Sequence, residues 1–162
     1  MIGAVHVSLG VMSLLFGAWI FLAAKGTRTH VRLGWVYVAC IAGLNASALG
    51  IYHLTGRPNL FHGLAVASLA MTGIGIAQPL RRRQSRKWLW RHYQYMCWSY
   101  VGLLAATVNE AAVRLPVLRQ FCASTLPALP LLASGAMVGV GAGVILFFQR
   151  RVLESTGHSG RE

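Results

Sequence analysis

The sequence predicts an all-α integral membrane protein, a bundle of about five transmembrane helices with the N-terminus outside and the C-terminus in the cytoplasm. Three observations predict this fold class. The chain is 56% hydrophobic and only 11% charged, whereas a soluble domain is about 25% charged. Its apolar residues fall in runs long enough to cross a bilayer as helices, and its mean hydropathy is +0.56. Its basic residues gather in the gaps between these runs.

The apolar runs have the length of transmembrane helices. A hydrocarbon core about 30 Å thick needs roughly 20 apolar residues in a helix, and single strands would leave backbone groups unpaired in lipid. The runs that qualify cover residues 4–24, 34–54, 62–80, 92–113 and 129–148. Because no basic segment precedes the first run, we expect it to be retained as a span. We therefore expect one transmembrane domain over residues 1–153 and a polar tail over 154–162.

The basic residues predict the orientation. The gaps after the first and third runs, together with the residues after the last run, hold all but three of the 15 Lys and Arg residues. Cytoplasmic loops carry such an excess, so the pattern predicts a multi-pass protein of the bacterial inner (plasma) membrane. We expect these cations to contact anionic lipid headgroups. A net charge of +12 also suggests nucleic acid, but no basic domain exists to bind it, and we expect no such partner.

Three glycines in the last run follow one another at intervals of four residues: Gly135, Gly139 and Gly143. This GxxxG spacing lets another helix backbone approach closely. The frequency of the motif in apolar helices favours packing within the bundle. The other interpretation is a contact with a partner, which would give a homo- or hetero-oligomer.

The fourth run carries a charge near its outer end. Glu110 is the only acid in any expected span, and charged residues within a membrane are functional candidates because they are costly there. It lies one helical turn before Arg114, so the two can pair. One interpretation is a structural ion pair near the interface. The other is a polar gate of Asn109, Glu110 and Arg114 in a small transporter.

Histidines form an outer group in this topology. His6, His53 and His62 lie at predicted outer ends of spans, and Glu110 lies at a similar depth. Imidazoles and a carboxylate suit zinc, iron or copper, which makes these four residues a candidate metal site. They come from four different helices, so their spacing does not bring them together. The alternative is that each polar tip lies separately at the interface.

A second pair of histidines lies at the predicted inner end. His30 and His92 meet the depth condition for the two axial ligands of haem b, and Met96, one turn after His92, is placed to line the pocket. The alternative is contact with lipid phosphates. The leading hypothesis is therefore a redox protein that holds haem b, or less readily a metal, through histidines. The competing hypothesis is a non-catalytic membrane subunit or small transporter, and no motif decides whether the protein is an enzyme.

Two stretches carry a family resemblance. The Lys-Gly-Thr-Arg-Thr-His loop at 25–30 and the Arg-His-Tyr-Gln-Tyr-Met stretch at 91–96 resemble a family of small predicted bacterial membrane proteins of unknown function. In that family one histidine follows the first span in a Lys-Gly-Thr-x-x-His loop, and another opens a later span as His-x-x-x-Met. The resemblance implies a multi-span bundle and directs attention to His30 and His92. It implies no activity.

Overall fold

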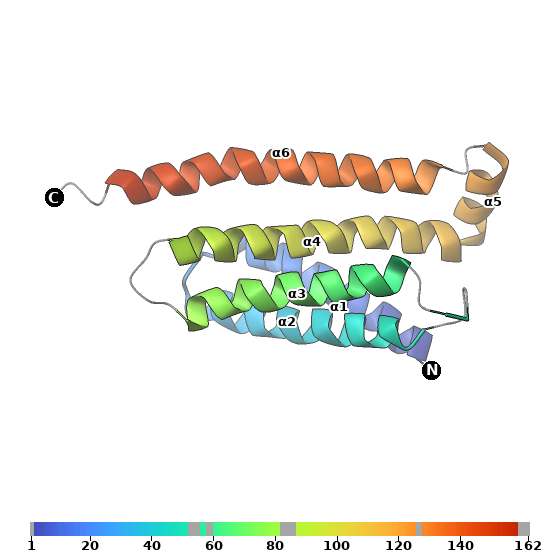
Figure 1. Ribbon diagram of the computed structural model, residues 1–162, viewed down its shortest axis with the longest axis horizontal. Helices are drawn as coiled ribbons and strands as arrows, with labels where there is room; N and C mark the ends of the chain where they lie inside the picture. Colours follow the sequence, from blue (N-terminus) through green and yellow to red (C-terminus); the bar gives the residue numbers. More distant parts are fainter. Residues whose placement is uncertain (1, 52–55, 58–59, 82–86, 126–127, 159–162) are drawn as a thin grey trace. The chain divides into compact units, whose positions relative to one another are not determined.

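The computed structural model describes residues 2–51, 56–57, 60–81, 87–125 and 128–158, and the regular structure in these ranges is α-helical. This confirms that the fold is all-α, as predicted, while the orientation in the membrane stays a prediction. The helices follow one another as α1 (Ile2–Leu22), α2 (Arg28–Leu49), α3 (Leu60–Leu80), α4 (Lys87–Arg114), α5 (Pro116–Thr125) and α6 (Leu129–His158) (Figure 1).

Four helices in the described part of the chain are long and apolar enough to cross a membrane. They cover Ile2–Leu22, Arg28–Leu49, Phe61–Leu80 and Leu129–Gln149, and each overlaps one of the predicted runs. The chain is therefore a membrane protein with several spans. The remaining predicted run, 92–113, is helical as part of α4, but it is not among these four because polar and charged residues occur along it.

Two features of the C-terminal half differ from the prediction. No helix was predicted between the runs 92–113 and 129–148, but this segment contains α5, which begins at Pro116. Proline is favoured at the first position of a helix because its missing N–H would have no partner there. In addition, α6 extends to His158, so the helix continues through the basic residues and into the segment expected to be a polar tail.

The chain divides into two compact units, residues 1–73 and 74–162, and the boundary falls within α3. In the first unit α1 packs against α2. A Cβ at Gly43 would lie 3.1 Å from Leu9 Cδ1, and one at Gly50 would lie 3.1 Å from Ile2 Cδ1. The later residue of α1, Leu9, contacts the earlier glycine, Gly43, and the earlier residue, Ile2, contacts the later glycine, Gly50. The two helices are therefore antiparallel. Glycines at these points allow the backbones to approach closely.

Polar side chains also join the helices of the first unit. Asn45 of α2 donates through Nδ2 to Ser68 Oγ of α3 at 3.1 Å and to the carbonyl of Ile41 at 2.8 Å. His6 Nδ1 of α1 lies 2.9 Å from Ser47 Oγ of α2. Hydrogen bonds of this kind help to hold helices together in lipid, where the hydrophobic effect does not.

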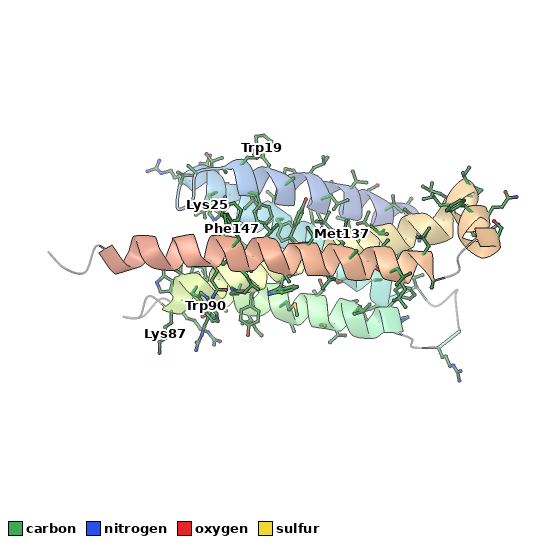
Figure 2. All side chains as sticks on the ribbon, turned by 90° about the horizontal axis from the view of Figure 1, so that it is seen from above. Trp19, Lys25, Lys87, Trp90, Met137 and Phe147 are labelled. Carbon is green, nitrogen blue, oxygen red and sulfur yellow. The ribbon has the colours of Figure 1, made fainter. Side chains whose placement is uncertain are left out.

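In the second unit α4 and α6 lie side by side (Figure 1). Cys97 and Val101 of α4 are buried against Ile145 of α6. A Cβ at Gly141 would lie only 2.6 Å from Val101 Cγ2, so this glycine sets the close approach of the pair. Figure 2 shows Lys87 and Trp90 projecting at the beginning of α4, where an indole is suited to the membrane interface.

Candidate functional site around His92

The site begins with a proline inside α3. Pro79 lies within this helix, and proline has no backbone N–H. In an α-helix the N–H of residue 79 would donate to the carbonyl of residue 75. The carbonyl of Gly75 therefore lacks its usual donor, and in a membrane such a group needs another partner.

His92 of α4 supplies that partner. Its Nδ1 lies 2.8 Å from the carbonyl oxygen of Gly75. A carbonyl oxygen only accepts hydrogen bonds, so Nδ1 carries the proton and donates it. The bond thus compensates for Pro79 and joins the end of α3 to α4.

The absence of a side chain at Gly75 brings the two helices close enough for this bond. A Cβ at Gly75 would lie 2.8 Å from Met96 Sδ and 3.1 Å from Tyr95 Cβ, distances too short for a real side chain without a shift of its neighbours. Met96, one turn after His92, occupies the space where a side chain at residue 75 would lie. The structure therefore brings together two of the predicted site residues, His92 and Met96.

The hydrogen bond also decides which ring nitrogen of the neutral imidazole is basic. With the proton on Nδ1, Nε2 carries the lone pair. Histidines that bind metals commonly donate their other ring N–H to a backbone carbonyl or a carboxylate, which fixes the tautomer and the orientation of the ring. His92 makes the same kind of hydrogen bond to a backbone carbonyl through Nδ1.

The neighbours of His92 fix α4 on its other side. The Tyr93 hydroxyl donates to the carbonyl of Ile145 at 3.1 Å, and Gln94 Nε2 donates to Gln149 Oε1 at 2.6 Å. Both acceptors belong to α6. The first turns of α4 are therefore held between the end of α3 and α6.

His30 lies within a helix and not in a loop. It is the third residue of α2, and its N–H donates to Thr27 Oγ1, the N-cap side chain, at 3.2 Å. His30 belongs to the first unit of the chain and His92 to the second, so the pairing of the two as axial ligands stays a prediction.

The loop just before His30 ends one helix and begins the next. Lys25 Nζ donates to the carbonyls of Ile20, Phe21 and Ala23, at 2.6, 2.9 and 3.1 Å, and so covers the open end of α1. Gly26 turns the chain with a φ of +78°, a conformation that glycine adopts readily. Thr27 then caps α2. The Lys-Gly-Thr sequence therefore has a structural function before His30 is considered.

The predicted outer metal site receives no support from the described residues. His6 is bound to Ser47, and His62 is buried in α3. Glu110 accepts from Arg114 Nε. Within the described ranges no group of three or more His, Cys, Asp or Glu side chains is placed to hold a metal ion. His53 lies outside those ranges, so the four-residue site stays a prediction.

The polar residues at the end of α4 bond to one another and to their neighbours. Arg114 and Glu110 form an ion pair in which the two side chains are 46% and 41% exposed, respectively. Asn109 donates to Ser134 Oγ of α6 at 2.9 Å and to the carbonyl of Ala105 at 3.1 Å. This arrangement favours a structural ion pair over a polar gate.

Close packing in α6 falls on a glycine outside the predicted stripe. No described atom lies within 4 Å of a Cβ built at Gly135, Gly139 or Gly143, whereas Gly141 contacts Val101. Within the second unit, therefore, the GxxxG stripe is not the surface on which α4 and α6 pack. Its contact with a partner stays a prediction.

The comparison with protein families confirms the resemblance found in the sequence. The family described as "Predicted membrane protein (DUF2306)" matches residues 3–146. The chain belongs to this family. Both motifs, the Lys-Gly-Thr-x-x-His loop and the His-x-x-x-Met segment, lie within the matched residues. No curated protein and no solved structure matches the chain, so the DUF2306 family gives the class of protein and leaves its activity open.

Sequence reasoning found His92 and Met96, but it missed Gly75 and the contribution of Pro79 to the site. The sequence does contain a sign of this site. A proline inside an apolar helical run leaves the carbonyl of the residue four positions earlier, here Gly75, without its helical donor. What one sequence does not give is the donor that replaces the proline N–H. That depends on which helix packs against α3, and hence on the fold.

Proposed function

We propose that this protein is a small electron-transfer protein that binds haem b, with His92 as an axial ligand through Nε2. The observation that carries the proposal is the 2.8 Å hydrogen bond between His92 Nδ1 and the carbonyl of Gly75. It holds the ring in one tautomer and one orientation, as ligating histidines are held. Haem supplies the redox chemistry, and the protein sets its ligands, burial and surroundings.

The second axial ligand in this proposal is His30. Its place near the start of α2 meets the requirement that a ligand come from a helix and not from a mobile loop. Basic residues concentrate around the start of α2, at Lys25, Arg28 and Arg32, and around the start of α4, and the positive-inside rule puts both helix starts on the cytoplasmic side. The proposal therefore puts His30 and His92 on the same side of the membrane.

This topology needs α4 as a fifth span, with the N-terminus outside and the C-terminus in the cytoplasm. At 28 residues, α4 is about 42 Å long, which exceeds the roughly 30 Å of a hydrocarbon core. Its charged residues lie toward its two ends, where they can reach the interfaces. A bacterial inner (plasma) membrane fits this charge pattern.

The residues around His92 have distinct functions in the proposal. The Gly75 carbonyl orients the imidazole and raises the basicity of Nε2 by accepting from Nδ1–H. Pro79 keeps that carbonyl available, because it cannot donate to it. Met96 contacts Gly75 and so acts as a positioning residue for α4. The competing transporter hypothesis has less support, since Asn109, Glu110 and Arg114 are engaged in local bonds.

The proposal is tested by absorption spectra of the purified protein, oxidised and then reduced with dithionite, after expression with ample haem. We expect a Soret band and sharp α and β bands in the reduced protein. The sharp α and β bands should be lost in His92→Ala and retained in His6→Ala, which removes a histidine bonded to Ser47 on another helix. Metal analysis of the same sample accounts for iron. A featureless spectrum from haem-replete cells would exclude the haem function.

A further inference from the structure

The short helix α5 has one apolar face. Val117 and Phe121 lie one turn apart, with Leu118 beside them, and Arg119 lies on the opposite side of the helix. Residues three and four apart share a face in an α-helix. The sequence of α5 thus puts apolar side chains on one side of the helix and Arg119 on the other, which is typical of an amphipathic helix.

The apolar face of α5 is exposed. Val117 is 78%, Phe121 50% and Leu118 39% accessible, and Leu115 just before the helix is 51% accessible. The helix contacts α4, but that contact leaves these side chains uncovered. A helix of ten residues is too short to be stable in water by itself, so its apolar face needs a partner.

The position of α5 in the second unit indicates what this partner is. α5 joins the end of α4 to the beginning of α6 and lies across the ends of these two helices (Figure 1). Because α6 is a candidate membrane span from Leu129 onward, a bilayer crossed by this helix would have its normal roughly along the helix axis. A helix lying across its first residues is then parallel to the membrane plane, at the level where the span begins.

The membrane span that follows α5 is also exposed where it begins. Leu131 and Leu132, in the first turn of α6, are 73% and 58% accessible. In a transmembrane helix such side chains face lipid. The exposed apolar side chains of α5 lie at the end of the unit where α6 begins. Lipid that covers Leu131 and Leu132 is therefore in a position to cover these side chains as well.

We propose that α5 is an interfacial helix that lies in the lipid headgroup region, with Val117, Leu118 and Phe121 toward the acyl chains and Arg119 toward the phosphates. Helices of this type bury their apolar face at the boundary of headgroups and acyl chains, and their cations are attracted to anionic lipid. The partner is the bilayer itself. This inference is independent of haem binding, because it concerns a different surface.

The test measures the surroundings of single residues of the full chain in vesicles of phosphatidylcholine and phosphatidylglycerol. A nitroxide is attached through Val117→Cys, with Gln120→Cys as the control away from the centre of the apolar face. Val140→Cys on α6, where Val140 is 68% accessible, gives the lipid reference. The background replaces the native cysteines Cys40, Cys97 and Cys122. Electron paramagnetic resonance then compares collision with oxygen, which concentrates in lipid, with collision with a water-soluble nickel chelate.

The proposal expects a ratio of oxygen to nickel collisions at residue 117 that is close to that at residue 140 and several-fold higher than that at residue 120. A higher nickel collision rate at 117 would show a water-exposed helix and overturn the proposal. Low collision rates for both reagents would show that a second copy of the chain covers the face, and would also overturn it.

A second measurement avoids the cysteine background. The unmodified protein in the same vesicles is labelled with a photoreactive diazirine confined to the membrane, and the labelled peptides are mapped by mass spectrometry. Insertion at Val117 and Phe121, at a level similar to that at Leu131, is expected. Absence of label from α5 alongside strong label on α6 would contradict the proposal.

Discussion

The imidazole of His92 lies 2.8 Å from the carbonyl oxygen of Gly75, and it replaces the helical donor that Pro79 cannot provide. This one hydrogen bond thus has two effects. It satisfies a backbone group that would be costly to leave unpaired in lipid, and it fixes the tautomer of the histidine that we propose as a ligand.

A double-mutant cycle on Pro79 and His92 tests this relationship. His92→Ala should destabilise the protein by about 1–3 kcal/mol, because the carbonyl of Gly75 loses its partner. Pro79→Ala supplies a backbone N–H for the same carbonyl, so the double variant should recover part of that loss. Unfolding in mixed micelles of increasing sodium dodecyl sulfate fraction gives the free energies. If the two effects simply add, the histidine does not compensate for the proline.

Gly75→Ala should destabilise the protein by about 1–3 kcal/mol, because the added methyl group collides with Met96 and Tyr95 and overpacking has a cost of this size. Gly73→Ala is the matched control on the same helix, since no described atom lies within 4 Å of a Cβ at Gly73. The control should be neutral or slightly stabilising, because alanine is the better helix former. Equal effects in the same unfolding assay would show that α3 and α4 do not approach at Gly75.

The same comparison on α6 separates packing inside the second unit from contact with a partner. Gly141→Ala should destabilise by about 1–3 kcal/mol, because its methyl group meets Val101 at a sub-van der Waals distance. Gly139→Ala should leave the free energy of unfolding of the monomer nearly unchanged. If the GxxxG stripe binds a second copy, Gly139→Ala should lower the dimer fraction measured by analytical ultracentrifugation in detergent. Destabilisation of the monomer by Gly139→Ala would contradict the packing described here.

Thr27→Ala should cost about 0.5–2 kcal/mol, because the N-cap of α2 loses the hydroxyl that accepts from the His30 N–H. Thr29→Ala is the control, since Thr29 is an exposed residue in the first turn of the same helix. Thermal unfolding followed by circular dichroism is a suitable measurement. A loss from Thr29→Ala as large as that from Thr27→Ala would show that capping is not the function of Thr27.

The sequence predicts the parts of this protein that depend on length and composition. Apolar runs of about 20 residues appear as α1, α2, α3 and α6, because a bilayer demands that length. It misses α5, because a ten-residue helix produces no long apolar run, and its Val117–Phe121 spacing is too short to stand out.

The candidate site, like α5, could be predicted only in part from the sequence. His92 is recognisable as a polar residue near the start of a span, and Pro79 as a helix breaker, but they are thirteen positions apart in the sequence. Their relationship exists only because Gly75 lets α4 approach α3 at that point. Contacts between helices depend on the order of helices around the bundle, and nothing in the hydropathy pattern sets that order.

The most direct test of the central claim is the electron paramagnetic resonance spectrum of the oxidised, purified protein, compared with that of His92→Ala. If His92 and His30 are the axial ligands of haem b, the wild-type spectrum should show low-spin ferric haem. Loss of His92 should convert it to high-spin haem or remove the haem. A wild-type protein from haem-replete cells with no ferric haem signal, or one whose low-spin signal survives His92→Ala unchanged, would contradict the account.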